Sequence, residues 1–249
     1  MILLDNERLD YVNDNLSLIQ KNDGLTFGTD ALLLAAYIVR RYECGVEIGG
    51  GSGIISMLLL TRNKILKADC VEVQESYAEL ISRNAELNSL SDRLTAVHSD
   101  IRSYRPEREY DTVFTNPPYM KATSGRENTV SAKNIARHEI FGDITDFARE
   151  GARLLKFGGE LYAVYRPDRL IDLICALRES GLEVKRMTFV YADTASEPSM
   201  ALVEAKKGAK SGMALTKPLI IYSDKEHKNY TDDMNYIMEN GSFPESFKR

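Results

Sequence analysis

Two periods alternate along the chain in the spacing of its apolar residues. Short runs rich in β-branched and aromatic residues predict strands, and runs with apolar residues three and four positions apart predict helices. The first predicted core strand and the glycine turn that follows it cover residues 45–53. The other predicted strands cover residues 68–73, 94–100, 110–116, 160–166, 182–192 and 199–207. The regular alternation of strands with helices is typical of a parallel sheet covered by helices.

The predicted helices cover residues 54–63, 75–88, 144–156 and 167–181, and a further helical run begins at Asp30. No helix separates the last two strands, so we expect a hairpin that places one antiparallel strand in an otherwise parallel sheet. A seven-stranded α/β sheet of this kind, with helices on both faces, resembles the Rossmann-like sheet of class I methyltransferases. We therefore expect one domain with three parts: a segment 1–42, a catalytic core 43–207 and an extension 208–249 packed on the core.

The composition is that of an ordinary globular protein, since 43% of the residues are hydrophobic and 28% are charged. The first residues do not read as a signal peptide, and no apolar run approaches the roughly 20 residues that span a bilayer. The cysteines (Cys44, Cys70 and Cys175) are scattered and lack the spacing of a zinc site or a disulfide framework. We expect a cytoplasmic protein, a monomer, without a metal.

The formal net charge of −5 argues against simple nucleic-acid binding, which needs clustered Lys and Arg. A local cluster does occur between residues 120 and 140, where basic residues outnumber Glu127 and Glu139. These basic residues are Lys121, Arg126, Lys133 and Arg137. The segment is either a solvated loop or a surface that lines the cleft for an anionic acceptor.

The stretch "EIGGGSG" connects the first predicted core strand to the next helix. It does not fit the dinucleotide fingerprint G-x-G-x-x-G, because Ile54 stands where the last glycine would be. The spacing is instead Glu47, Gly49, Gly51 and Gly53, a turn whose backbone approaches a ligand closely beside a helix N-terminus that favours a carboxylate. S-adenosylmethionine carries such a carboxylate, and Glu47 would face its ammonium group. The alternative is a tight strand–helix connection.

Two acidic residues follow the next two strands. Glu72 lies near the end of the second strand, where a carboxylate holds a ribose diol in folds of this kind. Asp100 follows the third strand in "HSDI" and would accept a hydrogen bond from an adenine amino group. Either residue alone could be a surface carboxylate, but their shared sheet edge favours a cofactor site for S-adenosylmethionine.

The stretch "TNPPY" follows the fourth strand. The two prolines end the strand and hold Asn116 and Pro117 in extended conformations. The Asn116 side-chain oxygen and the Pro117 carbonyl would accept both hydrogens of a weakly nucleophilic amine and direct its lone pair to a methyl donor. Tyr119 would stack on a planar base. The alternative is an ordinary Asn-Pro turn.

These motifs resemble the amino-methyltransferases that modify adenine N6 or the glutamine amides of release factors. Further stretches, "SLIQ…GLTFGTDALLLAAY", "ARHE" and "KPLIIY…NYTDDMNYIM", resemble the bacterial tRNA1(Val) (adenine-37-N6)-methyltransferase family along nearly the whole chain. The resemblance implies methylation of an adenine beside a tRNA anticodon. It also implies that Phe27, Thr29 and Asp30 of "FGTD" close over the methionine end of the cofactor. Read without the family, Phe27 is a core residue and Asp30 a helix N-cap.

The resemblance suggests that Arg137 and His138 lie on the acceptor side, whereas a pair on a helix surface is the alternative. Three other functions remain open. Methylation of release-factor glutamines is disfavoured because only about 40 residues precede the first core strand, and DNA adenine methylation because no target-recognition domain is evident. A non-catalytic RNA-binding module is disfavoured by the intact Asn116, Glu72 and Asp100.

Overall fold

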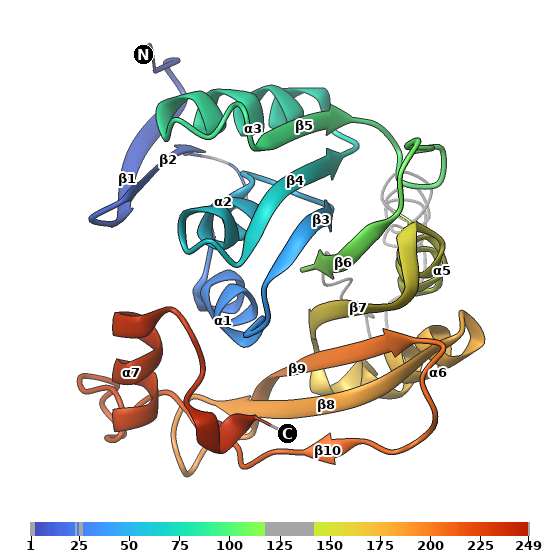
Figure 1. Ribbon diagram of the computed structural model, residues 1–249. Coiled ribbons are helices and arrows are strands. Elements are labelled where there is room, and N and C mark those ends of the chain that lie inside the picture. Colours follow the sequence, from blue (N-terminus) through green and yellow to red (C-terminus); the bar gives the residue numbers. More distant parts are fainter. Residues whose placement is uncertain (1–2, 23, 25–26, 118–141, 249) are drawn as a thin grey trace, which may run out of the picture.

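A twisted sheet runs through the middle of the molecule, with helices on both of its faces (Figure 1). The computed structural model describes residues 3–22, 24, 27–117 and 142–248. Within these residues the main sheet has nine strands in the order β10-β8-β9-β7-β6-β3-β4-β5, with β11 beside β8. Its longer strands are β3 (Tyr42–Ile48), β4 (Ile65–Glu72), β5 (Leu94–His98), β6 (Tyr110–Thr115), β7 (Leu155–Tyr165), β8 (Leu182–Tyr191) and β9 (Pro198–Lys207). The two-residue strands β10 (Ala214–Leu215) and β11 (Leu219–Ile220) pair with β8.

The directions of the strands confirm the predicted fold class, but the short strands β10 and β11 are additional to the seven strands that were predicted. Neighbouring strands from β5 to β7 are parallel, whereas β9 is antiparallel to both β7 and β8. The chain passes from β8 to β9 without a crossover helix, which is why this pair forms a hairpin. The parallel strands β3, β4, β5 and β6 therefore end at one edge of the sheet, called the carboxyl edge below, and begin at the opposite edge, called the amino edge.

The helices divide between the two faces. Residues of α1 (Thr29–Tyr37), α2 (Ile54–Thr61), α3 (Glu75–Leu87) and α7 (Asp232–Asn240) contribute to one buried apolar cluster. Residues of α5 (Ile144–Leu154) and α6 (Leu170–Glu179) contribute to the cluster on the other face. The described residues also form two short 3-10 helices, η1 (Pro167–Arg169) and η2 (Glu245–Phe247). No helix within the described ranges is long and apolar enough to cross a lipid bilayer.

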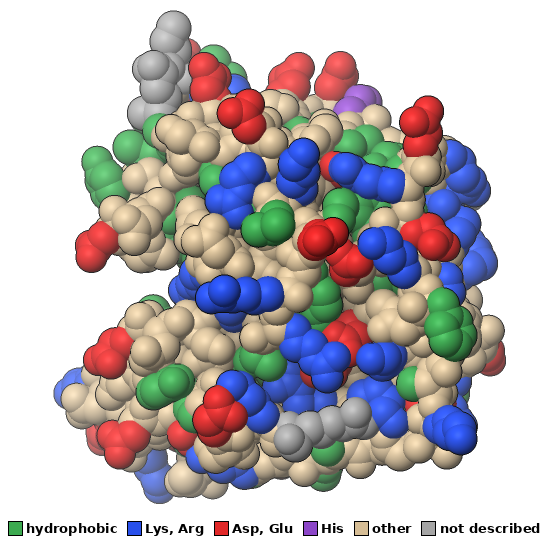
Figure 2. Space-filling model, viewed as in Figure 1, with side chains coloured by type: hydrophobic (Ala, Val, Ile, Leu, Met, Phe, Trp, Pro, Cys, Tyr) green, Lys and Arg blue, Asp and Glu red, His purple; other side chains and the backbone are tan. Residues whose placement is uncertain are grey.

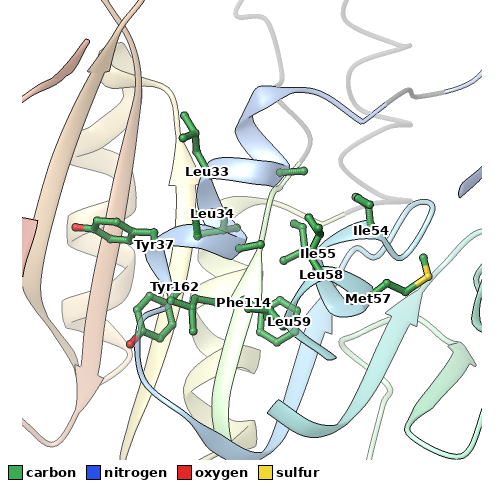
Figure 3. Close-up of a cluster of buried hydrophobic side chains, with 14 of the residues drawn as sticks. Leu33, Leu34, Tyr37, Ile54, Ile55, Met57, Leu58, Leu59, Phe114 and Tyr162 are labelled. Atoms are coloured by element: carbon green, nitrogen blue, oxygen red, sulfur yellow. The ribbon is translucent and has the colours of Figure 1, made fainter. Parts of the chain in front are cut away.

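Figure 3 shows how α1 and α2 meet the sheet. Leu33, Leu34 and Tyr37 of α1 belong to the same buried cluster as Phe114 of β6, and all four are fully buried. The seven residues of α2 from Ile54 to Leu60 are all buried from solvent. A helix that is buried on every side is apolar on every side, as α2 is apart from Ser56. Burial of each leucine, isoleucine or methionine side chain in this group contributes roughly 1.5–3 kcal/mol to the stability of the fold. The apolar contacts hold α1 against α2 and against β7, the strand beside β6, at whose end the predicted catalytic residues lie.

A hairpin that the sequence reasoning missed precedes α1. It consists of β1 (Glu7–Asn13) and β2 (Leu16–Lys21). Asn84 of α3 accepts a hydrogen bond from the Ile19 backbone N–H at 2.7 Å and donates to the Ile19 carbonyl at 3.1 Å, so its side chain pairs with β2 as a neighbouring strand would. Alternating apolar residues on either side of "NDN" were the available signal.

The predicted boundaries were wrong at the junction between α5 and β7. The predicted helix 144–156 ends at Leu154, and β7 begins at once at Leu155 rather than at residue 160. The glycines at 158 and 159 lie inside the strand, where the pairing of β6 with β7 shifts register and Gly158 has φ of +79°. A glycine pair in an extended segment marks a bulge here rather than a break.

Candidate active site

The glycine turn leaves the carboxyl edge between β3 and α2. Gly49 and Gly50 donate to the Val71 carbonyl of β4 at 2.9 and 3.2 Å, which fixes the start of the turn against the neighbouring strand. Gly49, Gly51 and Gly53 have φ values of +74°, +54° and +80°, a backbone region that side chains other than glycine rarely adopt. The alternate spacing recognised in the sequence is therefore a conformational requirement of the turn.

Gly50 and Gly51 serve different purposes. A Cβ atom at Gly50 would lie 2.1 Å from Cys70 Sγ, so this glycine allows the turn to pack on β4. A Cβ atom at Gly51 would meet nothing within 4 Å, so the backbone at Gly51 borders open space. The turn thus packs against the protein on one side and is free on the other to approach a ligand.

Glu47 lies under the turn rather than beside it. Its Oε2 accepts hydrogen bonds from the Ser56 backbone N–H at 2.9 Å and from the Ser56 hydroxyl at 2.5 Å. Glu47 is 1% exposed, and this burial raises the pKa of its carboxyl to about 7. The side chain caps the first turn of α2 from a strand, at a helix whose own N-cap residue is glycine. The prediction that Glu47 faces an ammonium group stays a prediction.

Glu72 connects the end of β4 to the glycine turn. Its Oε2 accepts from the Gly51 backbone N–H at 2.9 Å, and its Oε1 accepts from the Gln74 backbone N–H at 2.9 Å. The side chain is almost fully buried. Each carboxylate oxygen keeps further acceptor capacity, so these bonds are compatible with the predicted role toward a ribose diol.

Asp100 follows β5 at the same edge. Its carboxylate forms a bidentate pair with Arg102, with Nε–Oδ1 and Nη2–Oδ2 distances of 3.0 and 2.5 Å. These hydrogen bonds hold the pKa of Asp100 below its usual value. The Arg102 partner was not foreseen, and the predicted contact of Asp100 with an adenine amino group stays a prediction.

Asn116 directly follows β6, and its side chain meets Asp30 near the start of α1. Asn116 Nδ2 donates to Asp30 Oδ2 at 2.8 Å. Asp30 Oδ1 accepts from the Ala31 backbone N–H at 2.9 Å, while the N-cap of α1 is Gly28, so the N-cap interpretation of Asp30 is wrong. The structure thus brings together two residues, 86 positions apart, that the sequence motifs had placed in separate roles.

The other atom of the Asn116 amide is left unsatisfied. Asn116 Oδ1 is buried and has no hydrogen-bond partner among the described residues. Because Asp30 accepts only, the amide NH2 must face it, and the oxygen must face the other way. A buried acceptor without a partner costs free energy, and such an atom in a native structure calls for a ligand, an ion or a water.

Helix α1 is anchored at both ends. Near its start the Phe27 backbone N–H donates to Gln20 Oε1 of β2 at 2.9 Å, the half-buried Phe27 ring packs on the core, and Thr29 is exposed. At its end the buried Lys64 ammonium donates to the carbonyls of Ala35 and Ala36 at 2.9 and 3.2 Å. Burial lowers the pKa of Lys64 to about 7. These anchors fix the position from which Asp30 reaches Asn116.

The remaining predicted site residues fall at or beyond the end of the described segment. Pro117 is buried next to Asn116. The ring of Tyr119, the basic set and His138 lie outside the described residues; the basic set comprises Lys121, Arg126, Lys133 and Arg137.

The comparisons with known proteins decide the family. The family model of the methyltransferase small domain matches residues 21–179. The tRNA1(Val) (adenine(37)-N6)-methyltransferase of Phocaeicola vulgatus is 30% identical over 181 residues, which cover 72% of this chain and 76% of the relative. The enzyme of that name from Dyadobacter fermentans is 30% identical over 199 residues, 80% and 82% of the two chains. The chain belongs to this family of methyltransferases.

A solved structure supports the fold of this family member. The crystal structure of a predicted O-methyltransferase, Atu636 from Agrobacterium tumefaciens, has a TM-score of 0.69 at 22% identity, over 86% of this chain and 98% of that one. The family is one of S-adenosylmethionine-dependent enzymes, and its cofactor matches the glycine turn and the acidic residues at the carboxyl edge. This family member is therefore a methyltransferase that uses S-adenosylmethionine.

Several residues of the site were missed by sequence reasoning. Ser56, Arg102 and the Asp30–Asn116 contact belong to this group. A lone serine in the apolar run "IISMLLL" was a usable signal for a buried polar partner, and so was an arginine two positions after Asp100. The contact between Asp30 and Asn116 had no signal in a single sequence, because it depends on how α1 packs against the sheet.

Proposed function

We propose that the protein transfers a methyl group from S-adenosylmethionine to N6 of an adenine in tRNA, with adenine 37 of tRNA1(Val) as the target. The observation that carries the proposal is the buried Asn116 Oδ1 at the carboxyl edge, which has no hydrogen-bond partner among the described residues. The names of the relatives at 30% identity supply the substrate. The proposal includes action as a monomer in the cytoplasm, where tRNA is modified.

The residues at the carboxyl edge suit the cofactor. The open space over Gly51 admits a ligand against the turn, and Glu72 is available for a ribose diol beside it. Asp100 would contact the adenine end of the cofactor, and the segment Phe27–Asp30 would close over its methionine end. When bound, S-adenosylmethionine supplies a sulfonium methyl group that an amine lone pair can accept.

Asn116 supplies what an exocyclic amine needs. The lone pair of such an amine is delocalised into the ring, so the nitrogen is a poor nucleophile. Acceptors on its N–H groups favour a pyramidal nitrogen and aim its lone pair at the methyl donor. Asn116 Oδ1 is such an acceptor, without a partner among the described residues and held in a fixed direction by Asp30. The Pro117 carbonyl would accept the second hydrogen. Positioning of this kind contributes much of the rate in a two-substrate reaction.

No proton-abstracting base is required. The methylated nitrogen carries an extra proton after transfer and is then acidic enough to release it to solvent. Asp30 is already engaged by Asn116 and Ala31, and its role in the proposal is to orient the amide. The chain's contribution is thus to bind, to orient and to accept hydrogen bonds.

The test is label transfer from S-adenosylmethionine carrying a radioactive methyl group. The purified protein is incubated with bulk tRNA, with a release factor and with duplex DNA, and the tRNA product is digested to nucleosides. We expect label in tRNA as N6-methyladenosine. Label confined to the release factor would identify a glutamine methyltransferase, and label confined to DNA a DNA adenine methyltransferase; either result would overturn the assignment.

A further inference from the structure

Basic residues gather at the amino edge of the sheet, on the side opposite the predicted active site. On the face shown in Figure 2, Lys and Arg side chains spread across the middle of the molecule, whereas acidic side chains are frequent along the upper rim. The acidic net charge of −5 therefore hides an uneven distribution. The amino edge carries the cations Arg41, Lys67, Arg93, Arg108, Lys156 and Lys207.

These cations lie on one continuous surface. Arg93 donates to the Leu66 carbonyl at 3.0 Å, directly before Lys67 at the start of β4. Lys67, Arg108 and Lys156 together line a cavity of about 500 Å³, whose walls also include the carboxylates Glu43 and Glu109. Lys207 donates to the Leu155 carbonyl, directly before Lys156. The surface thus extends across the starts of five neighbouring strands, from β5 through β4, β3 and β6 to β7.

Not all of this positive charge is neutralised locally. Arg108 pairs with the buried Asp69 at 2.6 Å, and Lys156 pairs with Asp111 at 2.8 Å. Within the described part of the chain, no carboxylate lies within ion-pair distance of Arg41, Lys67, Arg93 or Lys207, and Arg41 and Lys67 are exposed. These four residues leave positive charge available to a polyanion.

Exposed apolar side chains accompany the charge. Phe157 is 83% exposed and comes directly after Lys156, and Leu66 is 55% exposed directly before Lys67. A Cβ atom at Gly208 would lie 2.2 Å from the Phe157 ring, so this glycine allows the ring to rest on the chain after β9. Cations interleaved with an exposed aromatic ring are typical of surfaces that bind nucleic acids.

We propose that the amino edge is a second RNA-docking surface, which binds tRNA phosphates away from the residues that hold the target base. The inference rests on the proposed function. Strand β4 has eight residues, so the two edges of the sheet are separated by roughly 25 Å. An isolated anticodon stem-loop held at the carboxyl edge leaves most of this surface unused, whereas the rest of a tRNA can reach along the protein to it. The surface also explains how a protein with a negative net charge can bind the phosphates of RNA, because its positive charge is concentrated locally.

The experiment compares two double variants of the full chain. Lys67→Glu with Lys207→Glu changes the amino edge and leaves the ion pairs of Asp69 and Asp111 intact. Lys225→Glu with Lys228→Glu is the matched control, because it changes the net charge equally at exposed positions between β11 and α7. Dissociation constants for tRNA and for an isolated anticodon stem-loop are measured at several salt concentrations in the presence of S-adenosylhomocysteine, and thermal unfolding confirms that each variant folds.

The amino-edge variant should bind tRNA at least about fivefold more weakly than the control, with a log–log salt slope smaller in magnitude by roughly 1.5, because two phosphate contacts are lost. Its affinity for the stem-loop should change much less. Equal affinities for the two variants, or an equal loss for tRNA and stem-loop, would overturn the inference. If the wild type binds tRNA but does not methylate it, the proposed function fails, and the variants still decide the docking surface.

Discussion

Asn116 Nδ2 lies 2.8 Å from Asp30 Oδ2, and this one hydrogen bond fixes the direction of the only other polar atom of the Asn116 side chain. The acceptor Oδ1 is buried and unpartnered among the described residues. Asp30 is itself held because α1 is anchored at its far end by Lys64 and through Phe27 at its near end. The fold therefore maintains a costly unsatisfied oxygen at the edge where a methyl acceptor is expected.

Asp30→Asn should lower kcat more than it changes cofactor binding. The substituted amide can still meet Asn116, but it no longer dictates which way the Asn116 amide faces. Loss of a charge-assisted hydrogen bond worth about 1.5–3 kcal/mol predicts a fall in kcat of roughly 10- to 100-fold. Steady-state kinetics and calorimetry with S-adenosylhomocysteine check this. A large loss of cofactor affinity with an unchanged kcat would instead support the cofactor-closing role that the family resemblance implies for Asp30.

Asn116→Ala removes the acceptor itself. We expect cofactor affinity within about threefold of wild type and a fall in kcat of roughly 100- to 1,000-fold, the range seen when a preorganised hydrogen-bonding group is removed from an active site. Thr112→Ser, at the other described residue with an unpartnered buried side-chain oxygen, is a suitable control because it lies within β6 and away from the edge. Turnover by Asn116→Ala equal to that of the control would exclude Asn116 from the mechanism.

Gly50→Ala should destabilise the protein through a clash with Cys70, which a second substitution at Cys70 should relieve. The added Cβ would lie 2.1 Å from Cys70 Sγ, and overpacking of this kind costs about 1–3 kcal/mol of unfolding free energy. With Cys70→Ala as a second substitution the sulfur is absent, and the nearest atom of that residue is its Cβ at 3.7 Å. Denaturant unfolding of the two single variants and the double variant should show a strong favourable coupling. Additive effects would contradict the packing role of Gly50.

Glu47→Gln should change how stability depends on pH. The folded protein holds the Glu47 carboxyl protonated up to about pH 7, whereas the unfolded chain ionises near pH 4.5. The stability gained from the protonated form is complete below pH 4.5 and is lost as the pH rises through 7. The variant stays neutral, so at about pH 8 it should exceed wild type by up to about 3 kcal/mol, with little difference at acidic pH. Unfolding titrations in the absence of cofactor test this, and parallel pH curves for the two proteins would contradict it.

The longer strands of the main sheet could be predicted because each of them has a clear sequence pattern. The stretch "TVF" of β6 is a buried, β-rich run that is closely followed by two prolines, and the missing helix between β8 and β9 revealed the antiparallel strand. The hairpin β1–β2 was missed because it stands apart from the main sheet, and its strand β2 is paired with asparagine side chains of α3.

The site was predictable as a set of elements but not as a set of contacts. The motifs placed the glycine turn, Glu72, Asp100 and Asn116 at one edge, because parallel strands end together. The partners of the individual side chains depend instead on contacts between residues far apart in the sequence. Glu47 turned toward the start of α2, and Asp30 toward Asn116, because of how the helices pack on the sheet.

A crystal structure with S-adenosylhomocysteine and an adenine-containing RNA would test the role of Asn116 without any intermediate assumption. We expect the adenine N6 atom to lie within hydrogen-bond distance of Asn116 Oδ1 while Asn116 Nδ2 remains on Asp30. An Asn116 oxygen turned toward another protein group, with the adenine amine held elsewhere, would refute that role.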